Sequence, residues 1–255
     1  MRWKVSSSSV TGRSHKDRGE PGQDYSKAGS VRFADHEFFI GLAADGAGST
    51  THGGRGAEIA CETVFLSIID TLRQDGNLTQ ITNEVICGWI TVSRDAIAEE
   101  AKNAGKRSKD YACTLLGVVA GRDHALFFQI GDGAIVVSAD GEFTTIFWPE
   151  QGEYANTTFF VSDDTFPEHL ATLHCDTSPE EIALFTDGLQ NLVLSFSEKK
   201  AHAGFFRPLF AALRNDPGNE FSDFAGQLGR FLNRDDISAR SDDDKTLVLA
   251  VQSPG

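Results

Sequence analysis

The stretch LAADGAGSTTHGGRGAEIA (residues 42–60) joins a hydrophobic run to a helical pattern through an aspartate and a loop of small residues. The run EFFIGLAA (37–44) predicts a buried β-strand that ends at Asp45, with Gly46 directly after it. A strand holds its last residue rigidly, and glycine lets main-chain atoms approach a ligand closely. An Asp-Gly pair alone is usually only a turn, so a binding site here depends on other strands with the same design.

Several other predicted strands begin or end on carboxylates. These carboxylates are Asp187 after EIALFT (181–186), Asp242, Asp243 and Asp244 before TLVLAV (246–251), Asp132 between FFQI and AIVV, and Asp24 after a Gly/Pro-rich loop. Asp140-Gly141, by contrast, is interpreted as a hairpin turn only.

Carboxylates that converge repel one another, and such a cluster is stable only with cations inside it. Oxygen ligands favour hard ions such as Mg²⁺ or Mn²⁺, and no His/Cys spacing offers a zinc site. Two such ions about 4 Å apart would bridge a water, lower its pKa and direct it at a phosphoryl group.

The order of the predicted elements indicates an α+β fold with antiparallel sheet in one domain over residues 1–255. Helical periodicity covers 54–73 and 82–104, two further helical stretches lie within 204–233, and 11–25 is interpreted as a loop. Strands are expected at 3–10, 37–44, 113–120, 125–130, 134–139, 142–148, 181–186 and 245–252. The four strands of 113–148 are predicted to form an antiparallel meander.

Composition excludes several classes of protein. The formal net charge of −14 argues against nucleic acid as a partner. The four cysteines show no C-x-x-C spacing and are expected to be buried free thiols, which suits a reducing compartment. The N-terminus has no signal-peptide pattern, and no apolar run approaches the ~18 residues of a membrane helix. A cytoplasmic protein that does not bind membranes is expected.

Seven motifs occur in order along nearly the whole chain: GQD (22–24), ADGAGS (44–49), GGRGAEIA (53–60), ACTLLGVV (112–119), QIGDGAIVV (129–137), LFTDGLQ (184–190) and DDDKTLVLAV (242–251). With these motifs the chain resembles the metal-dependent type 2C protein phosphatases. It is most similar to a compact bacterial branch, because Ala47 stands where the animal enzymes have a histidine.

This resemblance implies an αββα sandwich, in which two antiparallel sheets are flanked by helices and two Mn²⁺ or Mg²⁺ ions lie between the sheet ends. It implies that Asp45 bridges both ions and that the Gly46 carbonyl is a further ligand. Asp187 and Asp243 would complete the shell of the first ion. Asp24 would act through water, and Asp132 would help to hold a third, weaker ion.

The chain departs from the family pattern at several positions. His15 occupies the place of a phosphate-binding arginine, and Arg13 and Arg18 lie near enough to substitute for it. Gln23 replaces a glutamate, and Asp243-Asp244 replaces an Asp-Asn pair. The family's proposed proton donor is missing at Ala47, so His52 is either a proton donor or a helix-entry residue. Residues 148–161 correspond to a variable flap, whose aromatic residues either contact substrate or anchor the loop.

The implied activity is that of a hydrolase that acts on phosphoserine and phosphothreonine in proteins, by in-line attack of a hydroxide bridging the two metal ions. The implied substrates are targets of a serine/threonine kinase, phosphotyrosine is left open, and a monomer is expected. Two alternatives stay open. One is a pseudophosphatase that uses the fold as a binding or regulatory module, and the other is a small-molecule phosphatase.

Overall fold

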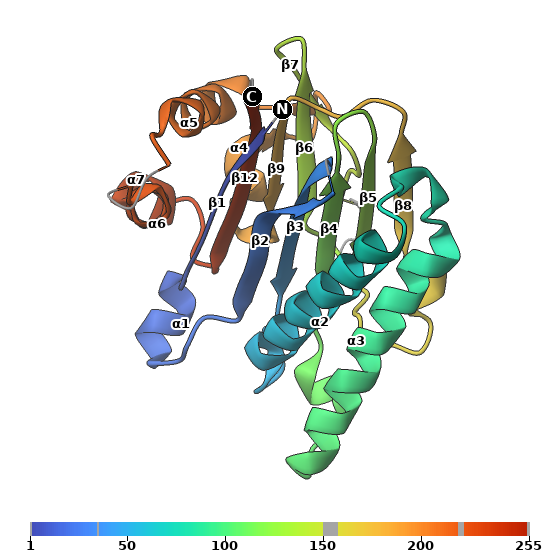
Figure 1. Cartoon of the computed structure of the whole chain (residues 1–255). Coiled ribbons are helices and arrows are strands. Elements are labelled where there is room, and N and C mark those ends of the chain that lie inside the picture. Colours follow the sequence, from blue (N-terminus) through green and yellow to red (C-terminus); the bar gives the residue numbers. More distant parts are fainter. Residues whose placement is uncertain (1, 35, 150–157, 219–221, 254–255) are drawn as a thin grey trace.

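The computed structural model describes residues 2–34, 36–149, 158–218 and 222–253 (Figure 1). In these residues two five-stranded antiparallel sheets lie face to face. The first sheet has the order β1 (Arg2–Val10), β12 (Lys245–Ser253), β9 (Glu181–Phe185), β6 (Ala134–Ala139), β7 (Glu142–Thr145). The second has the order β2 (Asp24–Phe33), β3 (His36–Asp45), β4 (Leu115–Ala120), β5 (Ala125–Ile130), β8 (Ala171–Cys175). A small ribbon pairs β10 (Leu194–Ser195) with β11 (Lys200–Ala201).

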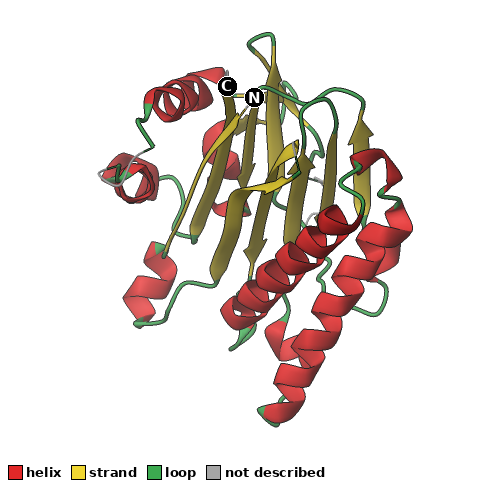
Figure 2. Cartoon of the chain, viewed as in Figure 1, coloured by secondary structure: helices red, strands yellow, loops and turns green. Residues whose placement is uncertain are grey.

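Helices cover the outer face of each sheet (Figures 1 and 2). The long helices α2 (Gly53–Gln74) and α3 (Asn83–Asn103) pack on the second sheet, whereas α5 (Ala203–Asn215) and α6 (Phe224–Leu232) pack on the first. The shorter helices are α1 (Arg13–Arg18), α4 (Gln190–Val193) and α7 (Asp235–Ser238), with 3₁₀ turns η1 (Leu78–Gln80), η2 (Ser108–Tyr111), η3 (Phe166–His169) and η4 (Asp187–Leu189). The layers helix, sheet, sheet, helix confirm the predicted sandwich.

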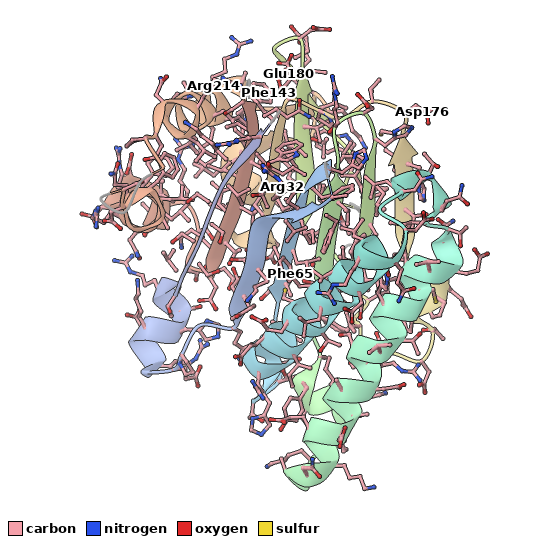
Figure 3. All side chains as sticks on the ribbon, in the orientation of Figure 1. Arg32, Phe65, Phe143, Asp176, Glu180 and Arg214 are labelled. Atoms are coloured by element: carbon pink, nitrogen blue, oxygen red, sulfur yellow. The ribbon has the colours of Figure 1, made fainter. Side chains whose placement is uncertain are left out.

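The alternation of side chains along β3 builds two of the hydrophobic layers. Ile40 and Leu42 face α2 and α3, whereas Phe39 and Ala43 face the other sheet. The third layer lies under α5, where Phe143 of β7 packs against Phe206 and Phe210. Figure 3 shows Phe143 at the end of the molecule that also carries Arg214 and Glu180.

The predicted meander over 113–148 is wrong at its centre. Strands β4 and β5 form one hairpin and β6 and β7 form another, but the two hairpins belong to different sheets. The chain crosses between the sheets at residues 131–133, where Gly131 has φ of 95°. The Asp140-Gly141 turn is confirmed, with φ values of 53° and 78°. Alternation of apolar and polar residues identifies a strand, but it does not indicate which other strand pairs with it.

The helix predictions for 54–73 and 82–104 agree with α2 and α3 to within about a residue at each end, as expected for helix boundaries. The predicted loop 11–25 contains α1 and the first residues of β2. Strands β2 and β8 were not predicted, because their half-exposed residues show no clear apolar alternation.

Two remaining expectations concern the flap and the cysteines. Of the predicted flap, residues 150–157 lie outside the described residues. On either side of them Trp148 packs edge-on against Phe196, and Phe159 stacks on His169, which favours the anchoring role.

All four cysteines are free, and two are only half-buried. No helix in the described ranges is long and apolar enough to cross a membrane.

Candidate metal centre

The carboxylates at the strand ends meet at one end of the sandwich. Asp24 is the first residue of β2 and lies directly opposite Asp45, the last residue of β3. In the other sheet Asp187 follows β9 and Asp243 precedes β12, and these two strands are neighbours. Since both sheets present carboxylates at the same end, acidic side chains far apart in the sequence share one space.

A cavity of about 220 Å³ opens at this end. The predicted metal-site residues that line it are Asp45, Gly46, Asp132, Asp187 and Asp243. His15 lines it as well, together with Ala47, Gly48, Ser49, Thr114, Thr158 and Phe160. Asp24, opposite Asp45 on the neighbouring strand, is not part of the lining. The structure therefore brings together all the residues expected to touch the ions directly.

The electrostatics of the cavity disfavour three ionised carboxylates. Burial, and then the charges of Asp243 and Asp132, raise the pKa of Asp187 to about 7. Burial also raises the pKa of Asp45, with the charges of Asp24 and Asp187 as further causes. The pKa of Asp24 is raised by its own burial. No Lys or Arg is found among the described residues that line the cavity, so like charges face one another without a compensating side chain.

The donors around the cavity fit hard divalent cations. All the predicted ligands offer oxygen, from carboxylates or from the Gly46 main chain. The Oδ1 atom of Asp24 is shielded from solvent and has no hydrogen-bond partner, which is costly for a carboxylate unless a cation or water completes it. In the described part of the chain, no three His, Cys, Asp or Glu side chains are grouped tightly enough to hold an ion by themselves. Main-chain oxygen and water would therefore complete the coordination.

Hydroxyl groups hold two of these aspartates in place. Thr186 Oγ1 donates to Asp24 Oδ2 over 2.7 Å, and the main-chain N–H of Asp45 donates to Thr114 Oγ1 over 3.0 Å. The two threonines thus fix one carboxylate oxygen of Asp24 and the main chain of Asp45.

The loop that carries Asp132 is held by two glutamines and a threonine. Gln129 Nε2 donates to the carbonyls of Gly131 and Gly133, over 2.9 Å in each case. The side chain of Gln190 donates to the Asp132 carbonyl, and Thr158 Oγ1 donates to Asp132 Oδ2 over 3.0 Å. The crossing between the two sheets is thus rigid where it presents its carboxylate.

The glycines of the Asp-Gly pairs are required by packing of the protein itself. A Cβ atom on Gly46 would lie 2.2 Å from the carbonyl carbon of Gly53, at the start of α2. A Cβ atom on Gly188 would lie 1.9 Å from the Asp244 carbonyl oxygen. We expected these glycines to admit a ligand; the structure shows that they admit a neighbouring segment of main chain.

His15 contacts Asp244, which is buried beside the cavity. Its Nδ1 atom lies 3.0 Å from Asp244 Oδ1, and the residues are 5% and 2% exposed. The two arginines predicted to substitute for His15 do not line the cavity. Arg18 is paired with Glu20 on the surface, and Arg13 is exposed. Of the three predicted phosphate-binding residues, the structure places only His15 at the site.

His52 is placed at the entry to α2 and not in the cavity lining. Its ring stacks on Tyr111 with centroids 4.9 Å apart, and its main-chain N–H donates to the Asp110 carbonyl. The geometry favours the helix-entry interpretation of His52.

Sequence reasoning missed the residues that support the aspartates. Thr114 and Thr186 were interpreted only as parts of predicted strands. A polar residue at the start or end of an apolar run could have indicated a supporting role. The sequence identified Asp244 only as one of the three carboxylates before TLVLAV. No local signal shows that it turns away from Asp243 and into the protein.

Comparison with known proteins places these features in context. The profile described as Protein phosphatase 2C matches residues 11–233. The chain is 32% identical over 253 residues to serine/threonine-protein phosphatase 3 of Escherichia coli (strain K12), covering 98% of this chain and 99% of that protein.

Solved structures share the fold at low sequence identity. The serine/threonine phosphatase PstP/Ppp of Mycobacterium tuberculosis superimposes with a TM-score of 0.63 at 14% identity, over the whole of both chains. Stp1 of Staphylococcus aureus gives a TM-score of 0.64 at 13% identity, covering 100% of this chain and 96% of that one. The catalytic domain of PstP in complex with two manganese ions gives a TM-score of 0.59 at 15% identity, covering 98% and 97%.

Proposed function

The chain belongs to the protein phosphatase 2C family and is a protein serine/threonine phosphatase, and from this premise we propose that its activity is metal-dependent. The observation that carries the proposal is the meeting of Asp45, Asp187 and Asp243 in one cavity. These carboxylates come from both sheets and have no basic partner in the described lining. The two manganese ions of the similar PstP catalytic domain support the proposal.

Each predicted ligand has a role in this proposal. Asp45 would hold both Mn²⁺ or Mg²⁺ ions, the Gly46 carbonyl would be a further ligand, and Asp187 and Asp243 would complete the first ion's shell. Asp24 would act through water, and Asp132 would contribute to a third ion. When bound, the two ions polarise the phosphoryl oxygens and lower the pKa of a shared water.

The other lining residues suit a phosphate group. His15 offers a ring nitrogen, and the hydroxyls of Ser49, Thr114 and Thr158 border the same cavity. Small side chains at 47–49 leave room beside Asp45 for a phosphorylated serine or threonine. We propose His15 as a contact to the substrate phosphate, whereas the geometry offers no support for His52 as the proton donor.

The test is hydrolysis of an aryl phosphate with Mn²⁺, compared between the wild-type chain and Asp45→Asn. We expect EDTA to abolish activity and the substitution to lower kcat/KM at least 100-fold, because a carboxylate shared by both ions is lost. The matched control is Asp140→Asn, which removes the same charge from an exposed turn and should keep full activity. Activity that persists both in EDTA and in Asp45→Asn contradicts the proposal.

The pseudophosphatase alternative is motivated by the changes at His15 and Gln23. Titration calorimetry with Mn²⁺ separates the two, because a failed site would bind no ion tightly. We expect tight binding, since the aspartate set is complete.

We also infer one domain over 1–255, a cytoplasmic location and a monomer that acts on proteins phosphorylated by a serine/threonine kinase. The only large hydrophobic side chains found exposed in the described residues are Leu66, Val92 and Leu173, which is little apolar surface for a partner. A panel of phosphopeptides would show whether phosphotyrosine is also accepted, and light scattering would report the oligomeric state.

A further inference from the structure

We propose that Asp244 is a positioning residue, which holds the His15 ring so that its Nε2 atom faces the substrate phosphate. The proposal rests on the proposed phosphatase function. His15 lines the metal cavity, whereas Asp244 lies behind it and is 2% exposed. The distance of 3.0 Å between Nδ1 and Oδ1 joins a residue of α1 to one that precedes β12, across 229 positions.

Both oxygen atoms of the Asp244 carboxylate have hydrogen-bond partners inside the protein. Its Oδ1 atom accepts from the Gly12 main chain over 2.6 Å and contacts His15, and its Oδ2 atom accepts from the Gln23 main chain. Asp244 therefore cannot turn to the cavity as a ligand without leaving buried N–H groups unpaired. Its neighbour Asp243, by contrast, lines the cavity.

The contact to Asp244 decides which ring nitrogen of His15 is available. Since an ionised carboxylate only accepts hydrogen bonds, Nδ1 carries its hydrogen toward Asp244. A carboxylate on one ring nitrogen fixes both the orientation of an imidazole and its proton arrangement. Nε2 is then the ring atom left for the substrate. It donates to a phosphate oxygen when it carries a hydrogen as well, so the ring binds phosphate as an imidazolium with Asp244 as its partner.

A second feature explains why this histidine needs such a partner. The charged residues in the rest of the lining are all acidic, and they include Asp45, Asp187 and Asp243. An imidazole ring that is free to rotate would be drawn to any of these carboxylates. Asp244 accepts the hydrogen bond from Nδ1, which keeps Nε2 directed at the substrate rather than at a metal ligand.

The experiment is a double-mutant cycle on His15→Ala and Asp244→Asn, with KM and kcat for an aryl phosphate and Ki for inorganic phosphate as readouts. We expect His15→Ala to raise KM and Ki about tenfold, the size of one lost charge-assisted hydrogen bond. Asp244→Asn should do the same, and the double variant should be no worse than either single variant. Effects that multiply in the double variant would overturn the proposal.

The matched control is Asp242→Asn. It removes the same charge two residues away at an exposed position, so it should leave KM and Ki unchanged. A further comparison uses His15→Arg, whose guanidinium is charged without a partner. In that background Asp244→Asn should no longer change Ki. If Asp244→Asn instead weakens Mn²⁺ binding and leaves Ki unchanged, Asp244 acts through Asp243 and the proposal is wrong.

A measurement on the wild-type chain covers the case in which Asp244→Asn does not fold. Nitrogen NMR of the histidine rings should show a hydrogen on Nδ1 of His15, and added inorganic phosphate should shift the Nε2 resonance toward that of a nitrogen that carries a hydrogen. A ring that carries its only hydrogen on Nε2, or that does not respond to phosphate, would contradict the proposal. Because this readout needs no turnover, it is independent of whether the chain hydrolyses phosphate esters.

Discussion

At the scale of single residues, the site depends on chain neighbours that combine a cavity-facing group with close packing. Asp45 and Gly46 both line the cavity, and Gly46 also packs against the start of α2. Asp243 faces it too, and Asp244 is buried behind it. A strand end is a good place for such a pair, because neighbouring residues point in opposite directions.

A substitution at Gly46 tests the packing half of such a pair. Gly46→Ala places a methyl group 2.2 Å from the Gly53 carbonyl carbon, so the start of α2 must move. We expect a loss of about 1–3 kcal/mol in unfolding free energy and weaker Mn²⁺ binding. Chemical denaturation and calorimetry measure both. In Gly48→Ala the added methyl group has nothing within 4 Å, so an equal loss there would contradict the packing argument.

At the scale of elements, strands and loops position the ligands while helices supply the hydrophobic cover. The loop at 131–133 presents Asp132 because Gln129 of β5 and Gln190 of α4 hold its main chain. Helix α5 lies away from the metal cavity and buries Phe206, Phe210 and Leu213 on the first sheet. Core side chains of α5 are therefore expected to affect stability without affecting metal binding.

Phe206→Ala in α5 tests this separation. The ring is fully buried and packs against Phe143, Phe185 and Phe210, so the substitution leaves a large cavity. We expect a loss of about 3–5 kcal/mol in unfolding free energy, with KM unchanged while the protein remains folded. Phe205→Ala removes the same group from a half-buried position and should cost less. Equal losses in the two variants would disprove the assignment of Phe206 to the core.

At the scale of the whole molecule, the metal cavity lies where the two sheets meet, and its carboxylates repel across that junction. The folded-state pKa of Asp187 is about 7, against an ordinary value of 3.8. The metal-free folded chain therefore holds a proton that the unfolded chain releases between these values. The contribution of Asp187 to the free energy of unfolding is therefore present at low pH. It is lost as the pH rises from about 4 to about 7.

This linkage predicts how Tm responds to pH and to metal. In EDTA, the Tm of the wild-type chain should fall relative to that of Asp187→Asn as the pH is raised from 5 to 7. At pH 7, Mn²⁺ at about 100 times its Kd should raise the wild-type Tm by roughly 5–10 °C. Differential scanning calorimetry measures both effects. Parallel Tm curves for the two chains in EDTA would refute the linkage.

Much of this architecture could be predicted from local pattern. The apolar runs before Asp45 and Asp187, the run after Asp243 and the periodicity of α2 and α3 are readable because each depends on neighbours within a few residues. The motifs around them also indicated the family. Local pattern determined the strand-end aspartates and the kind of ion they suit, whereas the layers followed from the family resemblance.

Only the tertiary structure decided how distant segments meet. It separated β5 from β6 into different sheets, turned Asp244 inward to contact His15, and placed His52 against Tyr111 outside the cavity lining. The alternation of side chains along a strand is the same whichever strand lies beside it. The pairing of β1 with β12 is what brings Asp244 to His15. Local sequence sets which face of a strand is buried, whereas packing between sheets sets which polar groups meet there.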